Sequence, residues 1–181
     1  MATKNYNPTT STPLLVENLI SNIAEMEYQN HTLYLASESK YKNSSPTADP
    51  HFQKSPTKVP SKLSKIFYYR IFFNHFELLE IEDSAFAHFS LMLRTVNNRI
   101  AAGKEGICPE RFKMLVAATF FISLKYMMDD YSIYLVDFAR MGKVDPEVLE
   151  EAELYLLVEL LKGDIHYDER SYLRELDRLL H

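Results

Sequence analysis

The chain has 181 residues, of which 46% are hydrophobic and 25% charged, and its formal net charge is −5. This length suffices for one domain with a substantial core, and the acidic balance without a Lys/Arg cluster argues against nucleic-acid binding. One cysteine, Cys108, excludes an intramolecular disulfide, and no run reaches the roughly 18 apolar residues that span a bilayer. Since the N-terminus also lacks a signal-peptide core, we expect a cytoplasmic or nuclear protein with no membrane or nucleic-acid partner.

Residues 13–35 carry apolar side chains at helical spacing, which predicts an amphipathic N-terminal helix within a first region of residues 1–35. Thr12 suits the N-cap of this helix and Pro13 its first turn. Residues 36–60 are rich in Ser, Pro and Lys and show no periodicity. They are predicted to form a linker.

The remainder of the chain is predicted to be all-helical, because glycines are few and alternating apolar segments are scarce. Asp145 as N-cap followed by Pro146 is a strong helix start, and Gly163 suits the end of that helix. Five helices are expected at residues 62–79, 83–101, 109–128, 131–140 and 145–162. A final helix is expected at residues 168–180, within a C-terminal region of residues 167–181.

The helix predicted at 109–128 is apolar on nearly every face over residues 114–124. No side of such a helix can face water, so it must lie at the centre of a bundle. Lys125 ends the apolar run, where a lysine either extends to solvent or contacts a partner. Asp129 and Asp130 follow, and adjacent residues point in different directions at a helix end, which argues against an acid/base pair or a metal site.

Motifs for enzymatic chemistry are missing from the sequence, including Gly-rich phosphate loops and the HExxH metal motif. His75 and His88 fall on separate predicted helices and are interpreted as core-edge residues. Cys108 precedes a helix N-terminus that could lower its pKa, but no neighbouring base is evident, so an ordinary thiol is favoured. We therefore expect no catalytic activity, no cofactor and no metal.

Four segments, taken in order, resemble parts of one cyclin box. FYYRIFFNHF at 67–76 resembles its first helix, and MLRTVNNRIAA at 92–102 resembles the end of its second. AATFFISLKYMMDD at 117–130 resembles the third helix, and residues 138–167 resemble the passage from the fourth to the fifth. The resemblance implies an all-α fold in which residues 61–166 form a single five-helix cyclin box with an extra N-terminal and a C-terminal helix. The phosphate-pathway (P/U-type) cyclins of fungi and protists are the most similar branch.

The family implies a regulatory subunit that binds and activates a cyclin-dependent Ser/Thr protein kinase in cell-cycle or nutrient signalling. In its members a lysine of the third helix and a glutamate of the fifth hold the kinase's regulatory helix, and Lys125 and Glu153 match them. Leu157 and Asp129 complete the implied kinase-binding set. An opposite-charge pair at the end of a hydrophobic groove would fix the register of an incoming helix. The run from Glu153 to the motif at 163–165 is one residue longer than in many members.

Arg70 matches a family arginine that pairs with an aspartate of the second box helix. That second position is Asn98 in this chain. Both residues are expected in the core of the box, where Arg–Asn keeps hydrogen bonds but loses the ion pair. The carboxylate that would partner a buried Arg70 cannot be named from the sequence.

An aromatic group on the first box helix matches a patch that recruits kinase substrates or inhibitors in many cyclins. The alternative is a buried stripe, because side chains three and four positions apart share one helix face. The group comprises Tyr69, Phe72, Phe73 and Phe76.

The predicted linker contains sites for proline-directed kinases. Ser55 begins an S-P-x-K pattern, and Ser45 is followed only by proline, as is Thr12 ahead of the linker. Phosphorylation would add negative charge near the start of the box.

Three alternatives to a kinase activator remain open. One is a cyclin-fold scaffold that binds a kinase without activating it, which the replacement at Asn98 makes worth considering. Another is a transcription-factor-like domain of the same fold, although such domains are commonly basic and have two boxes. The third is an unrelated all-α enzyme that holds a cofactor within the bundle.

Overall fold

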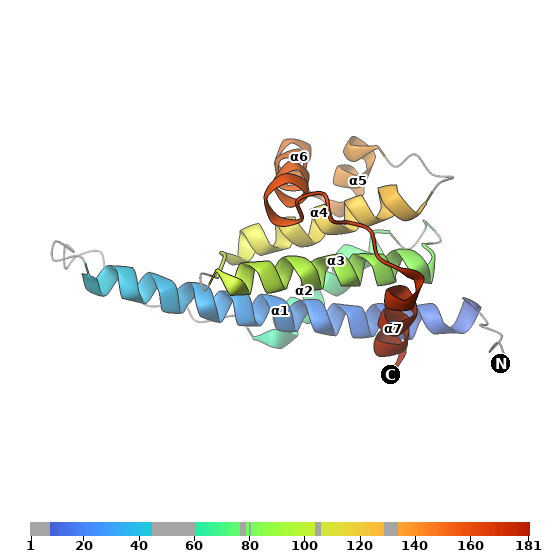
Figure 1. The fold of residues 1–181 in the computed structure, drawn as a ribbon, viewed down its shortest axis with the longest axis horizontal. Helices are drawn as coiled ribbons and strands as arrows, with labels where there is room; N and C mark the ends of the chain where they lie inside the picture. The colour runs from blue at the N-terminus through green and yellow to red at the C-terminus, as the bar shows by residue number, and fades with distance from the viewer. Residues whose placement is uncertain (1–7, 45–60, 77–78, 80, 104–105, 129–133) are drawn as a thin grey trace.

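The chain folds as a bundle of helices in which one long helix lies along the others (Figure 1). The computed structural model describes residues 8–44, 61–76, 79, 81–103, 106–128 and 134–181. Within these residues there are seven α-helices and no β-strand, which confirms the predicted all-α class. No helix among them combines the length and apolarity needed to cross a membrane. The helices are α1 (Pro8–Ser44), α2 (Lys62–Asn74), α3 (Asp83–Ala102), α4 (Pro109–Met127), α5 (Leu135–Gly142), α6 (Pro146–Tyr155) and α7 (Glu169–Leu180), and a π-helical turn, η3 (Leu156–Leu160), continues α6.

Helix α1 is longer than predicted at both ends, with 37 residues. It begins at Pro8, so that Pro13 lies inside the helix rather than at its start, and it continues to Ser44. The first nine residues of the predicted linker, 36–44, are therefore helical. They contain neither Gly nor Pro, so no helix breaker interrupts them before Pro46. The rest of the predicted linker, 45–60, lies outside the described residues.

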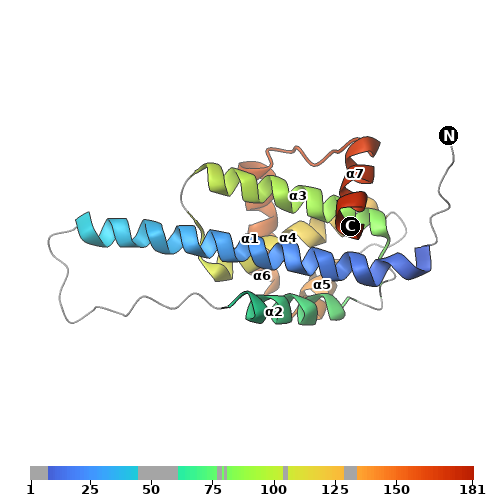
Figure 2. The same ribbon diagram turned by 90° about the horizontal axis from the view of Figure 1, so that it is seen from below.

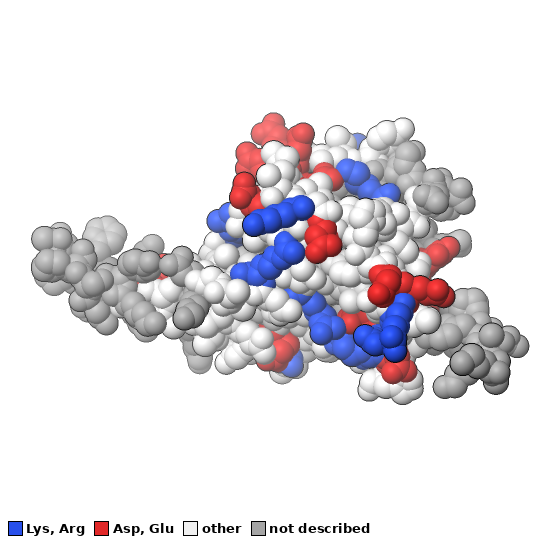
Figure 3. Space-filling model, viewed as in Figure 1, with Lys and Arg blue, Asp and Glu red and all other residues white. Residues whose placement is uncertain are grey.

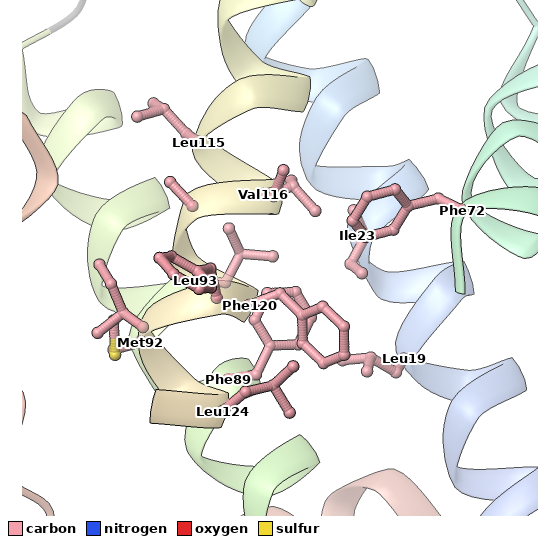
Figure 4. Packing of buried hydrophobic residues seen from close by; sticks show 14 of the residues in the cluster. Leu19, Ile23, Phe72, Phe89, Met92, Leu93, Leu115, Val116, Phe120 and Leu124 are labelled. Atoms are coloured by element: carbon pink, nitrogen blue, oxygen red, sulfur yellow. The ribbon is translucent and has the colours of Figure 1, made fainter. Parts of the chain in front are cut away.

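Helix α4 occupies the centre of the bundle, as its sequence predicted. Every residue from 115 to 124 is buried, and the helix packs against α1, α3, α5 and α6. The ring of Phe120 lies 5.1 Å from that of Phe73 and 5.3 Å from that of Phe89, measured between centroids. Figure 4 shows side chains of α1, α2 and α3 gathered around Phe120. The apolar surface of α4 is thus covered by neighbouring helices rather than exposed to water.

The start of α6 also matches its sequence signals. Oδ1 of Asp145 accepts hydrogen bonds from the backbone N–H groups of Glu147 and Val148, at 2.9 and 3.3 Å. Pro146 occupies the first turn, where its missing N–H has no consequence. Gly163 has φ of +75°, the left-handed conformation expected of a glycine that follows a helix.

Other helix ends differ from prediction by small amounts. Helix α2 stops at Asn74, five residues before the predicted end at Leu79, whereas α3 and α4 end within one residue of expectation. Helix α5 begins at Leu135 and ends at Gly142. The predicted start of α5 at Tyr131 lies outside the described residues.

Helix α7 closes the bundle by packing on α1 and α3, as Figure 2 also shows. Its Glu175 is buried and accepts hydrogen bonds from Ser90 Oγ at 2.6 Å and from an Arg94 nitrogen, Nη1, at 2.7 Å. Asn18 of α1 donates to the carbonyl of Leu179 at 2.7 Å. The first and last helices are thereby joined by a hydrogen bond.

Candidate protein-binding site

Lys125 and Glu153, which were both predicted to contact a kinase, lie side by side. Nζ of Lys125, in the last turn of α4, donates to Oε1 of Glu153 on α6 at 2.6 Å. The side chain of Lys125 is 47% exposed and that of Glu153 only 14%. The ammonium also lies 4.8 Å from the ring centroid of Phe121. The π face of this ring attracts the positive charge.

Apolar side chains that adjoin this pair in sequence are exposed. Leu154 and Val158, four positions apart, are both more than half exposed, and Tyr126 next to Lys125 is also exposed. Leu157 is partly buried against the core. Isolated exposed apolar residues are common, but several close in sequence to a charged pair are compatible with a strip against which a partner helix packs.

The helix that carries Glu153 changes its winding just beyond it. The N–H of Leu161 donates to the carbonyl of Leu156 at 2.7 Å, a separation of five residues that defines a π turn. A π turn accommodates one extra residue without displacing the rest of the helix. It lies within the run between Glu153 and the motif at 163–165, to which the sequence comparison assigned one additional residue.

The surface near the pair is mainly acidic on one side. Figure 3 shows acidic side chains gathered over α6, where Glu150 and Glu151 are exposed. Asp129, the remaining member of the predicted kinase-binding set, lies outside the described residues. The same holds for the predicted phosphorylation sites Ser45 and Ser55.

The expectation that Arg70 and Asn98 belong to the core is wrong. Both are exposed. Arg70 instead makes a two-point contact with Glu17 of α1, with Nε to Oε1 at 3.0 Å and Nη2 to Oε2 at 2.5 Å. It faces outward because the opposite face of α2, with its aromatic residues, is packed into the core. The carboxylate that sequence spacing could not supply thus comes from the N-terminal helix.

A buried ion pair that the sequence did not reveal joins α1 to α2. Nζ of Lys65 lies 2.5 Å from Oε1 of Glu27, and both side chains are almost completely inaccessible. The hydroxyl of Tyr69 donates to the other carboxylate oxygen of Glu27 at 2.7 Å. Burial, with a further contribution from the negative charge of Glu27, raises the pKa of Tyr69 well above its ordinary value. The only sequence signal for this pair is a lysine on a face otherwise aromatic.

The aromatic group considered as a recruitment patch is buried. Its four members are between 1% and 6% exposed, and its phenylalanines pack against Phe120 of α4, so the alternative of a core stripe holds and the docking patch does not. The group is Tyr69, Phe72, Phe73 and Phe76. The exposed side of α2 carries Leu63, Phe67 and Ile71 instead.

His88, interpreted from sequence as a core-edge residue, is fully buried. Its Nδ1 lies 3.0 Å from Oγ of Ser123 and its Nε2 lies 2.9 Å from the carbonyl oxygen of Ile165. Burial lowers the pKa of the imidazole. These bonds tie the segment after η3 to α3 and α4, which is a structural role. His75 is half-buried.

Among the described residues, no three His, Cys, Asp or Glu side chains gather as a metal site would require. Comparisons with known protein families, curated proteins and solved structures found no match. What bears on function is therefore the motifs of the chain and the geometry of its own side chains.

Proposed function

We propose that the chain is a cyclin-like regulatory subunit that binds and activates a cyclin-dependent protein kinase through the surface around Lys125 and Glu153. One observation carries the proposal. Two residues 28 positions apart, which the motifs independently assign to kinase contact, form an ion pair, and an exposed apolar strip adjoins them in sequence. The strip is defined by Tyr126, Leu154, Leu157 and Val158.

The two ends of this pair suit different tasks. Glu153 is mostly shielded and held by its neighbours, so it offers an acceptor of fixed position. Lys125 is half exposed and can turn toward a partner backbone carbonyl or carboxylate. A docking helix would cover the apolar strip, and the pair would set its register.

Activation follows if docking favours one conformer of the kinase. The regulatory helix of a protein kinase must rotate inward before the kinase's own Lys–Glu ion pair can form. A partner that binds the inward conformer more tightly than the outward one shifts the kinase population toward the active state. The size of the shift is set by the difference between the two binding affinities. The chain would need no chemistry of its own.

The direct test is purification of the tagged full-length chain from its native cells, identification of bound proteins by mass spectrometry, and a phosphorylation assay on the complex. We expect a cyclin-dependent kinase catalytic subunit in near-stoichiometric amount, with greater activity than the same subunit alone. Recovery of no protein kinase would refute the proposal.

A scaffold that binds a kinase without activating it is the second candidate. The position of Arg70 supports it, because this residue pairs with Glu17 at the surface rather than with the second box helix. The box therefore lacks an internal contact that the family resemblance implies. Binding with unchanged kinase activity in the same assay would favour the scaffold.

A further inference from the structure

A cavity of about 560 Å³ lies at the opposite end of α4 from Lys125, between α1, α2 and the N-terminus of α4. Its volume is within the usual range of small-molecule sites. The cavity is independent of the proposed kinase surface. Lys113, which lines it, is 12 residues from Lys125, or about 18 Å along the helix axis.

The N-terminus of α4 supplies hydrogen-bond donors to this cavity. Cys108 is the N-cap, but its side chain makes no capping hydrogen bond. The first intrahelical bond of the segment is donated by Phe112 to the carbonyl of Cys108. The N–H groups of Glu110 and Arg111 precede that bond, and they lie at the positive end of the helix dipole of a 19-residue helix.

His31 is a further polar side chain of the cavity wall. It lines the cavity from α1, is only 6% exposed, and its Nδ1 is buried without a hydrogen-bond partner. Buried polar atoms are rarely left without a partner, so this one calls for an explanation. Burial, reinforced by the nearby charge of Lys65, lowers the pKa of His31. The ring is therefore neutral near pH 7 and has one N–H to donate.

The two carboxylates and two ammonium groups that line the cavity balance, which disfavours a ligand with more than one negative charge. Lys65 is neutralised by its ion pair with Glu27. Lys113 remains as a cation, with Nζ 4.4 Å from the ring centroid of Tyr68, which also lines the cavity. The carboxylate of Glu110 stands at the exposed rim and would repel a dianion such as phosphate. One cation, a helix N-terminus and a neutral imidazole suit a monoanion.

The remaining walls are largely apolar and aromatic. Tyr34 and Leu35 of α1 face the cavity together with Tyr68 of α2. Such walls bind the flat, apolar body of a ligand, while the few polar groups orient its charged end. We propose that this cavity binds a small monocarboxylate with an aromatic body, its carboxylate directed to Lys113 and the N-terminus of α4.

The single cysteine of the chain makes the proposal testable in the intact protein. Cys108 lines the cavity, so the rate at which its thiol reacts with the uncharged reagent 4,4′-dithiodipyridine reports occupancy. We expect 3-phenylpropionate to slow this reaction saturably. The uncharged analogue 3-phenylpropionamide and inorganic phosphate should each require at least tenfold higher concentration, since each lacks one of the two recognised features.

Variants identify the groups responsible. Lys113→Gln should raise the half-protecting concentration of 3-phenylpropionate about tenfold, which is the loss expected for one charge-assisted hydrogen bond. His31→Gln should raise it as well, whereas Lys125→Gln, at the other end of α4, should leave it unchanged. Because Lys113 is partly exposed, its replacement should leave the fold intact even if the His31 variant does not fold.

Several outcomes would overturn the site. Absence of protection by millimolar 3-phenylpropionate would exclude a carboxylate site. Equal protection by the amide would remove the role of the charge, and stronger protection by phosphate would replace the proposed ligand class. Protection that is unaltered by Lys113→Gln would place the binding elsewhere.

Discussion

The ion pair between Lys125 and Glu153 joins the end of α4 to α6, with 2.6 Å between Nζ and Oε1. Its two members differ in environment, because the lysine is half exposed and the glutamate is largely shielded. Because water and salt screen the exposed lysine end, the pair contributes only modestly to folding stability. Its effect on a docked partner is larger, because docking excludes the water that screens it.

Lys125→Glu should therefore separate binding from folding. It places two carboxylates together at the site where a partner helix is proposed to dock. We expect kinase affinity to fall by at least about tenfold, with helix content retained and a much smaller effect on the unfolding midpoint. Co-purification with kinase and circular dichroism measure the two effects.

Lys143→Glu is the matched control, because Lys143 is also an exposed lysine but lies after α5, away from the pair. It makes the same change in net charge and should leave kinase binding intact. If the Lys125 and Lys143 variants both retain binding and activation, the assigned contact is wrong.

Glu27→Gln should destabilise the fold strongly. The substitution leaves the ammonium of Lys65 buried without its counter-charge and weakens the hydrogen bond from Tyr69. Removing one member of a buried pair lowers the free energy of unfolding by about 3–5 kcal/mol. Urea unfolding followed by circular dichroism measures this change.

Glu25→Gln provides the comparison within the same helix. Glu25 also pairs with a lysine of α2, with 2.8 Å to Nζ of Lys62, but both side chains are more than two-fifths exposed. Its replacement should change stability far less than Glu27→Gln does. Similar losses for the two variants would mean that burial does not determine the strength of these contacts.

Phe73→Ala and Phe67→Ala should distinguish the two faces of α2. The ring of Phe73 is buried, 5.1 Å from Phe120 and 5.9 Å from Phe89, whereas Phe67 is mostly exposed. We expect losses of about 3–5 kcal/mol for the buried residue and within about 0.5 kcal/mol for the exposed one. Denaturant unfolding of both variants checks this, and a stable Phe73 variant would return the buried group to consideration as a docking surface.

Much of the fold could be predicted from local patterns. The central position of α4 follows from its unbroken apolar run, and the start of α6 follows from Asp145 and Pro146, since both signals act within one helix. The end of α1 could not be predicted in this way. Residues 36–44 have a linker-like composition, but nothing in them breaks a helix.

The site was predicted less completely, because its contacts join distant parts of the chain. Lys65 and Glu27 are 38 positions apart, and Arg70 and Glu17 are 53 apart, beyond the reach of any helical spacing rule. The family resemblance also implied that Arg70 contacts Asn98. It gave no indication that a carboxylate of α1 would pair with Arg70. The π turn likewise depends on packing. The sequence therefore indicated an additional residue but not the change of helical winding that accommodates it.

Stability should fall between neutral and mildly acidic pH because of His88. Burial lowers the pKa of this imidazole below its ordinary value of 6.5, and the nearby His166 adds to the shift. Just below pH 6.5 the unfolded chain binds a proton there that the folded chain does not, so the free energy of unfolding rises with pH. The contribution is complete above 6.5 and is lost as pH falls toward the pKa of the folded state.

Urea midpoints measured from about pH 7 to about pH 5 test this dependence. His88→Gln should lower stability at neutral pH, because it disturbs the bonds to Ser123 and Ile165, but it should lose less further stability on acidification. His181→Gln, at the exposed end of α7, should keep the full dependence of the unaltered chain. Since His31 has a pKa lowered in the same direction, part of the dependence should persist in the His88 variant. Identical pH slopes with and without His88 would show that its protonation is not linked to unfolding.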